Sequence, residues 1–187
     1  MSLTETPVCN FGEKIKDFKL ISTEDTFVSL KDIKGQNGTL IMFICNHCPY
    51  VKAVIKELVD ITNKLSKIGI NSVAIMSNDV NNYPEDSFEN MKKFAKINNF
   101  KFPYLYDETQ EIAKMYGANK TPHVFILKKE KNNWVVKYIG AIDDNYENPK
   151  EVKRKYVEEA VNALLKNKAI ETKTTKAIGC GIKWKKR

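Results

Sequence analysis

The sequence predicts an α/β fold in which a central mixed β-sheet is flanked by helices. Short apolar runs of strand length alternate with longer segments in which apolar residues recur at helical spacing. The last two apolar runs are separated only by a Lys-Glu-Lys-Asn-Asn turn, which indicates an antiparallel hairpin beside otherwise parallel strands. With 187 residues and neither repeats nor a long linker, the chain is expected to form one domain over 1–187.

The first half is expected to hold a hairpin and then two buried strands joined by a long helix. Two short strands around a Ser-Thr-Glu-Asp turn at 15–31 predict an N-terminal β-hairpin extension. A continuous apolar run predicts a buried strand at 39–45, and the largely apolar segment 70–77 predicts the next strand. Between them, apolar residues from Val51 to Leu65 recur at helical spacing, and Pro49 suits the first helical turn because its missing N–H costs nothing there.

The second half continues the alternation of helices and strands. In chain order the pattern predicts a helix at 86–98, a strand at 102–107, a helix at 108–117, strands at 121–127 and 133–142, and an amphipathic helix at 149–166. Residues 1–14 are expected to be irregular, and 167–187 to form a polar C-terminal tail. This order of elements is that of the thioredoxin-like fold.

The charge and hydropathy patterns exclude several classes of function. The net charge is +8, but all of the 31 basic residues except Arg154 and Arg187 are lysines scattered along the chain, which argues against a nucleic-acid surface. The longest apolar runs have strand length, so neither a membrane span nor a membrane partner is expected. The N-terminus shows no secretory signal, so the expected location is cytoplasmic.

Two of the four cysteines, Cys45 and Cys48, form a C-x-x-C pair where a buried strand gives way to a helix. The positive end of the helix dipole lowers a cysteine pKa at such a position, and the spacing allows the two sulfurs to bridge. A C-x-x-C pair beside a βαβ pattern is typical of thioredoxin-like redox sites. Structural zinc sites usually take a second, distant ligand pair, which this chain lacks apart from His123 and isolated cysteines.

Three neighbours of this pair are candidates for supporting roles. Protonated His47, between the cysteines, would stabilise a thiolate and make the disulfide more oxidising. Pro122 begins an otherwise regular strand, and either a cis Thr121–Pro122 bond shaping a substrate groove or a plain strand-start proline explains it. Cys180 is a possible accessory thiol, on a tail that is expected to dock with Trp184.

Beyond these local patterns, the motifs "FICNHCPYVKAV", "YPEDSFENMKKFA", "FPYLYDETQEIAKMYGA", "TPHVF" and "GCGIKW" extend over nearly the whole chain. Together they resemble the peroxiredoxin-like, AhpC/TSA-related redoxin branch of the thioredoxin superfamily. The resemblance implies that Pro122 is a cis-proline facing the cysteine pair. It also implies that Cys45 is the exposed nucleophile and Cys48 its resolving partner.

The sequence departs from the peroxiredoxin pattern at the positions that matter for peroxide. Cys45 stands where peroxiredoxins carry a threonine, and Ala141 follows Gly140 where this branch usually has an arginine. A lysine lacks the planar fork that braces peroxide oxygens and a thiolate. Lys120 replaces a cysteine that often precedes Thr-Pro, and Thr39 stands where thioredoxin has an aspartate.

The leading hypothesis is therefore a thiol–disulfide oxidoreductase that exchanges disulfides through Cys45 and Cys48 and needs no cofactor. Its expected partners are protein or small-molecule disulfides and a thiol reductant or oxidant. The alternatives are a thiol peroxidase, a copper or zinc carrier using both cysteines with His47 or His123, and a redox sensor. For Cys9, an idle free thiol is as good an explanation as a redox role.

Overall fold

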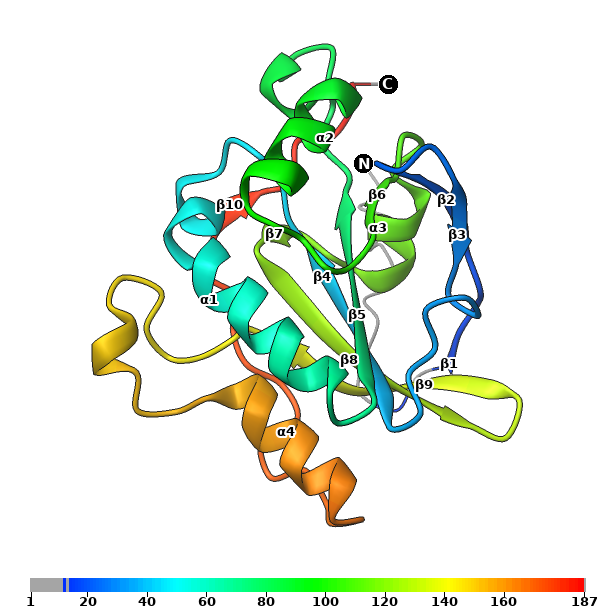
Figure 1. Ribbon diagram of the computed structural model, residues 1–187, viewed down its shortest axis with the longest axis vertical. Coiled ribbons are helices and arrows are strands. Elements are labelled where there is room, and N and C mark those ends of the chain that lie inside the picture. The colour runs from blue at the N-terminus through cyan, green and yellow to red at the C-terminus, as the bar shows by residue number, and fades with distance from the viewer. Residues whose placement is uncertain (1–11, 13, 187) are drawn as a thin grey trace, which may run out of the picture.

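A curled mixed β-sheet forms the centre of the protein, with helices on both of its faces (Figure 1). The computed structural model describes residues 12 and 14–186, so the expectations for Cys9 and for most of 1–14 lie outside the described residues. The strands of the main sheet are β1 (Lys14–Ile15), β2 (Lys19–Ser22), β3 (Phe27–Ser29), β4 (Gly38–Phe43), β5 (Ile70–Met76), β6 (Tyr104–Tyr106), β8 (His123–Glu130) and β9 (Asn133–Gly140).

The strand order within the described residues is β1-β9-β8-β4-β5-β6-β2-β3. Central β4 runs parallel to β5 and antiparallel to β8, and β8 and β9 form the expected hairpin. The two N-terminal strands, β2 and β3, pair with each other and extend the sheet beyond β6. The predicted α/β, thioredoxin-like arrangement with an N-terminal hairpin extension is thus confirmed.

The helices agree with the sequence pattern in number but not in every boundary. They are α1 (Pro49–Ser66), α2 (Phe88–Ile97), α3 (Glu111–Tyr116) and α4 (Tyr156–Leu165), with 3₁₀ turns η1 (Pro84–Asp86) and η2 (Pro149–Glu151). The predicted helix at 149–166 is wrong over its first third, where Val152 is extended and separates η2 from α4. The predicted helix at 86–98 begins two residues later, because Ser87 caps α2 by accepting a hydrogen bond from the Asn90 N–H.

Both faces of the central sheet are buried, which explains why β4 reads as a continuous apolar run. Its alternate side chains enter two separate hydrophobic clusters. Leu40 and Met42 pack with α1, α2 and α4, whereas Ile41 and Phe43 pack with α3 on the opposite face. The cysteine loop follows β4 directly, so these two clusters fix the end of the strand from which the loop starts.

The C-terminal tail is more ordered than its polar composition suggested. A short strand, β10 (Cys180–Gly181), pairs antiparallel with β7 (Lys120–Thr121), and the two form a second sheet. Figure 1 shows β10 beside β7, close to the start of α1. None of the helices within the described residues is long and apolar enough to cross a membrane.

Candidate functional site

The cysteine pair lies in the loop between β4 and α1, as the sequence predicted. Cys48 is the N-cap of α1: its backbone is extended, and its carbonyl accepts a hydrogen bond from the Lys52 N–H at 3.0 Å. Pro49 occupies the first helical position, where a missing N–H breaks no bond. The Cys48 side chain is therefore held at the positive end of the helix dipole.

Thr121, the last residue of β7 and the residue before the cis-proline, contacts both cysteines. The Thr121–Pro122 peptide bond is cis, which confirms that prediction. The Cys48 thiol donates a hydrogen bond to the Thr121 carbonyl at 3.2 Å, and the Cys45 sulfur lies 3.5 Å from the Thr121 hydroxyl. The sequence had placed these residues 70 or more positions apart, and the antiparallel pairing of β4 with β8 brings them together.

Both cysteines are buried. Cys45 is 1% exposed and Cys48 is 0% exposed, so the expectation of an exposed Cys45 is wrong for this structure. Cys180 of β10 is partly buried, packs against the hydrophobic cluster that contains both cysteines, and pairs with Thr121 across the β7–β10 ladder. The described structure thus brings three cysteines to Thr121.

The surroundings of the pair favour a thiolate on Cys48. Hydrogen bonding from Cys45, then from Cys180, and the Val51 N–H at the start of α1 lower the pKa of Cys48 to about 4 in spite of its burial. The pKa of Cys45 is raised, first because its proton is shared with Cys48, and then by burial and the Asp86 charge. The resemblance assigned the nucleophile to Cys45, whereas the electrostatics favour Cys48.

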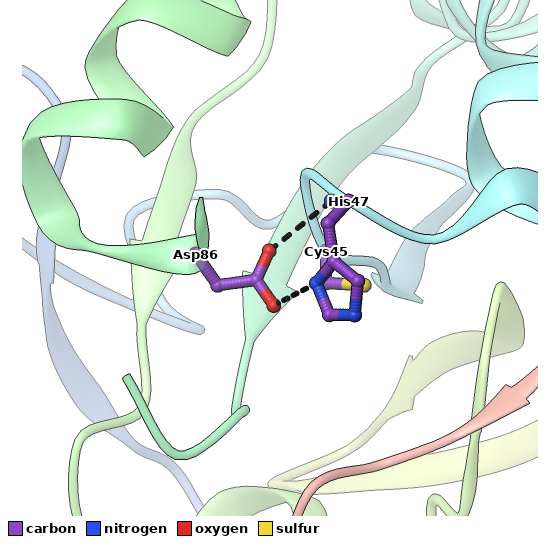
Figure 2. Close-up of side chains that lie close together, drawn as sticks. All are labelled: Cys45, His47 and Asp86. Carbon is purple, nitrogen blue, oxygen red and sulfur yellow. Dashed lines mark hydrogen bonds and ion pairs between the residues drawn. The ribbon is translucent and has the colours of Figure 1, made fainter. Parts of the chain in front are cut away.

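Asp86, in η1, is a residue of the site that the sequence did not reveal. It is 0% exposed, and its carboxylate accepts hydrogen bonds from four donors: the backbone N–H groups of Asn46 (2.7 Å) and His47 (3.3 Å), the His47 Nδ1 (2.6 Å) and the Asn78 side-chain amide (2.7 Å). Figure 2 shows the carboxylate facing the loop that carries the cysteines. A buried charge is tolerated because these donors compensate its lost hydration.

The contacts of Asp86 also determine the position of His47. The imidazole is bonded to Asp86 and stacked on the Tyr83 ring at 5.6 Å, with 23% of the side chain exposed. In Figure 2 its ring lies close to the Cys45 sulfur. A donor atom from each of Cys45, His47 and Asp86 lies within 4.8 Å of the others. His47 is thus oriented toward the pair, and the only sequence signal for its partner was an acid within "YPEDSFENMKKFA".

The potential metal ligands differ from those that the sequence offered. Cys45, His47 and Asp86 come together, whereas His123 packs its ring against Phe125 at 4.7 Å, and burial lowers its pKa to about 4. The four donors already on Asp86 fill the roughly four acceptor positions of a carboxylate. A metal ion at this cluster would have to break those hydrogen bonds.

The arginine of the described residues is committed elsewhere. Arg154 forms a two-pronged ion pair with Glu159 of α4, at 2.6 Å for its shortest contact, and also donates to Thr172. Ala141, which takes the place of the arginine typical of this branch, uses its N–H to bond the Thr175 hydroxyl. The bonds of Arg154 therefore leave its guanidinium outside the cysteine site.

Comparison with known proteins agrees with this architecture. A crystal structure of an uncharacterized conserved protein from Geobacillus kaustophilus is 42% identical, with a TM-score of 0.88, covering 96% of this chain and 94% of that one. Thiol-disulfide oxidoreductase ResA from Bacillus thuringiensis subsp. konkukian (strain 97-27) is 24% identical over 68% of this chain and 69% of its own length. Peroxidoxin BcpB from Mycobacterium tuberculosis, at 15% identity, shares the fold with a TM-score of 0.63, covering 84% of this chain and 97% of that one.

The family model agrees with these relatives. The model of the AhpC/TSA family matches residues 11–143, which include the cysteine loop, Asp86 and the cis-proline. The resemblance read from the sequence motifs is thereby confirmed at the family level. This chain belongs to the AhpC/TSA family and is, at the level of that family, a thioredoxin-like oxidoreductase.

Proposed function

We propose that this protein is a thiol–disulfide oxidoreductase that exchanges disulfides through Cys45 and Cys48. One observation carries the proposal: the Cys48 thiol at the N-terminus of α1 donates to the Thr121 carbonyl, and the Cys45 sulfur lies 3.5 Å from the Thr121 hydroxyl, so both cysteines meet beside the cis peptide bond. A low-pKa thiolate beside a second thiol is the arrangement that disulfide exchange requires. The name of the ResA relative supports the same class of reaction.

In the proposed reaction, Cys48 acts first and Cys45 second. The Cys48 thiolate attacks one sulfur of a substrate disulfide, and the other substrate sulfur leaves as a thiolate that takes a proton from solvent. Cys45 then loses its proton and attacks Cys48 in the mixed disulfide. The second substrate sulfur leaves as a thiol, and the Cys45–Cys48 disulfide remains until an external dithiol reduces it.

His47 is the proposed acceptor for the proton of Cys45. Its ring lies within 4.8 Å of the Cys45 sulfur, and the bond to Asp86 holds it in place. Thr39 has no carboxylate to offer, so the base that thioredoxin supplies from that position comes here from a different part of the fold. The Asp86 carboxylate would then stabilise the imidazolium that forms.

The proposed substrates are protein or small-molecule disulfides, in a cytoplasmic setting that keeps thiols reduced. A protein substrate would be held as an added strand along Thr121, on the edge of β7. That edge is paired with β10 in the structure, so such a substrate has to displace the tail. A small disulfide needs only access to Cys48.

The proposal is tested by trapping the mixed disulfide. In a background carrying Cys9→Ser and Cys180→Ser, the protein should reduce a peptide disulfide with dithiothreitol as electron source. Cys45→Ser in this background should accumulate a mixed disulfide on Cys48, and Cys48→Ser should abolish exchange. A trap formed on Cys45 instead would reverse the two roles. If both Cys45→Ser and Cys48→Ser still exchange disulfides at the rate of the background protein, the proposal is overturned.

Peroxide reduction is the second candidate, because a thiolate at Cys48 followed by Pro49 suits that chemistry as well. The engagement of Arg154 with Glu159 weighs against it, since within the described residues no free guanidinium is left for the transition state. The test is the rate at which hydrogen peroxide converts Cys48 to a sulfenic acid. A rate more than about a hundredfold above that of free cysteine would favour the peroxidase, since it corresponds to an activation free energy lower by about 2.7 kcal/mol. A rate similar to free cysteine would exclude it.

A further inference from the structure

The C-terminal strand β10 occupies the edge of β7 that precedes the cis-proline. Cys180 pairs with Thr121, and Gly181 pairs with Lys120, in antiparallel register. Figure 1 shows the two strands side by side near the start of α1. This is the edge at which a substrate strand would add, so the protein presents its own tail where a substrate would bind.

Several contacts anchor the tail just after Cys180. Ile182 is 6% exposed, and its N–H donates to the Asn119 carbonyl at 3.0 Å. The Lys183 carbonyl accepts from the Asp79 N–H at 2.8 Å and from the Gln110 side-chain amide at 2.8 Å. Trp184 had been expected to anchor the tail, but it is 41% exposed, so the buried anchor is Ile182 instead.

This docking places Cys180 opposite the residue that Cys48 contacts. Cys180 pairs with Thr121, whose carbonyl accepts from the Cys48 thiol, and Cys180 packs on the hydrophobic cluster that contains both Cys45 and Cys48. Cys48 therefore has two cysteines near it, Cys45 from its own loop and Cys180 from the tail. A substrate cysteine on an added strand would take the position of Cys180 opposite Thr121.

We propose that Cys180 is a third redox-active thiol of this site, and that the disulfide can migrate from Cys45–Cys48 to Cys48–Cys180. The proposal rests on the proposed function, because the migrating disulfide is the one that exchange leaves on the pair. It is carried by the register of β10 on β7, which sets Cys180 opposite Thr121, and by the hydrogen bond from the Cys48 thiol to the carbonyl of that same Thr121.

The step is an internal thiol–disulfide exchange with no net oxidation. Cys180 loses its proton to solvent, and its thiolate attacks the Cys48 sulfur. The bond between Cys45 and Cys48 breaks as the bond between Cys48 and Cys180 forms. Cys45 leaves as a thiolate and takes up one proton, so protons and electrons balance.

The migrated disulfide has a consequence for substrate binding. Once Cys180 is bonded to Cys48, the tail is fixed covalently along Thr121, and the edge of β7 is closed to an added strand. In the reduced state only hydrogen bonds and the burial of Ile182 hold the tail. The tail therefore acts as an internal substrate that competes with protein substrates when the site is oxidised.

Two glycines beside Cys180 supply a matched pair of test variants. A Cβ on Gly179 would lie 2.1 Å from the Thr121 carbonyl oxygen and 2.7 Å from its carbon, so Gly179→Ala has to push the tail off β7. A Cβ on Gly181 would meet only the Asn119 carbonyl oxygen at 3.9 Å, an ordinary contact, so Gly181→Ala leaves the tail docked. Neither substitution removes a thiol.

The experiment maps disulfides in the full chain carrying Cys9→Ser, equilibrated in glutathione buffers of stepped ratio and then acid-quenched and digested with trypsin. Cys45 and Cys48 lie on one tryptic peptide, 35–52, and Cys180 lies on another, 177–183. An internal disulfide within the first peptide reports Cys45–Cys48, and a cross-link between the peptides reports the migrated bond. Cys45→Ser and Cys48→Ser then identify which cysteine is bonded to Cys180.

We expect both species, with the cross-link retained in Cys45→Ser and lost in Cys48→Ser. Gly179→Ala should lower the cross-linked fraction at least tenfold, whereas Gly181→Ala should leave it unchanged. If the internal disulfide forms at every ratio and the cross-link never does, the third thiol is overturned while the proposed exchange stands. If the internal disulfide also fails to form, the proposed function itself is wrong.

Discussion

At the scale of single residues, Asp86 organises the site more than any residue except the cysteines. Its carboxylate accepts the N–H groups of Asn46 and His47, two consecutive residues of the loop between the cysteines. Asn46 in turn accepts a hydrogen bond from the buried Tyr104 hydroxyl at 2.9 Å. The loop conformation that brings Cys45 to Cys48 is thus fixed by hydrogen bonds to the protein interior.

Replacing Asp86 should therefore destabilise the fold as well as slow exchange. Asp86→Ala leaves two buried and two partly buried donors without an acceptor, and we expect the free energy of unfolding to fall by about 3 kcal/mol. Asp86→Asn retains one oxygen and the shape, so it should cost less while still weakening the hold on His47. Urea unfolding monitored by fluorescence measures both. A loss below about 1 kcal/mol for Asp86→Ala would contradict the role assigned to this carboxylate.

Glu57, on α1, predicts a pH dependence that is separate from the cysteines. Burial, then the nearby Asp143 carboxylate, raises the pKa of Glu57 to about 7, and one Glu57 oxygen is buried without a partner among the described residues. Between pH 4.5 and about 7 the folded protein keeps a proton that the unfolded chain releases. The contribution of Glu57 to stability is therefore lost as the pH rises through this window.

Glu57→Gln removes this titration. Relative to the natural chain, the variant should gain stability between pH 5 and pH 8, because an amide stays uncharged at both values. Urea unfolding at the two pH values measures the difference, with Glu151→Gln, at an exposed position, as the matched control. Equal shifts in the two variants would show that Glu57 is not the group responsible.

At the scale of elements, the docking of β10 depends on a side chain far away in the sequence. The Gln110 amide donates to the carbonyls of Ser77 (2.6 Å) and Lys183 (2.8 Å), and its oxygen accepts from the Lys185 N–H at 2.9 Å. Gln110 is 2% exposed and has a left-handed backbone, φ 64°. This one side chain joins the end of β5, the start of α3 and the tail.

Shortening Gln110 should loosen the tail without unfolding the domain. Gln110→Asn is the suitable change, because asparagine tolerates the left-handed conformation but its shorter amide cannot reach both strands. We expect amide hydrogen exchange in the peptide covering 181–185 to become at least tenfold faster, with the exchange of β4 unchanged. Gln36→Asn, at an exposed position, is the control. Unchanged exchange in the tail would mean that other contacts suffice to hold it.

At the scale of the whole molecule, the low pKa of Cys48 links the redox state to folding. The pKa of Cys48 lies near 4 in the folded protein, below its usual value of 9.0. The thiolate therefore stabilises the reduced fold fully above pH 9, and this contribution is lost as the pH falls toward 4. Oxidation to Cys45–Cys48 removes the contribution altogether.

The reduced protein should consequently resist urea better than the oxidised protein, and by a larger margin at pH 8 than at pH 5. A Cys9→Ser, Cys180→Ser background restricts oxidation to the single pair. Urea unfolding of both redox forms at the two pH values gives the margin. By the same thermodynamic cycle, the pair should be more oxidising than thioredoxin at about −270 mV. A margin independent of pH would place the thiolate elsewhere.

The fold and part of the site could be predicted because they depend on local patterns. Apolar runs identified β4 and β5, helical spacing identified α1, and the position of Pro49 indicated where that helix begins. The prediction of one helix over 149–166 was wrong after Pro149, because amphipathic spacing alone does not reveal an extended break such as the one at Val152. Helix boundaries depend on caps and tertiary contacts, which a periodic pattern does not contain.

The sequence by itself thus determined the α/β architecture, the C-x-x-C pair at a helix N-terminus and the resemblance to a family that uses thiol chemistry. Only the tertiary structure decided that Asp86 holds the loop, that Thr121 contacts both cysteines and that Cys180 pairs with Thr121. The physical reason is distance along the chain. Asp86 is 40 residues from Asn46, and Thr121 is 73 from Cys48, so their contacts depend on strand pairing and burial rather than on local propensity.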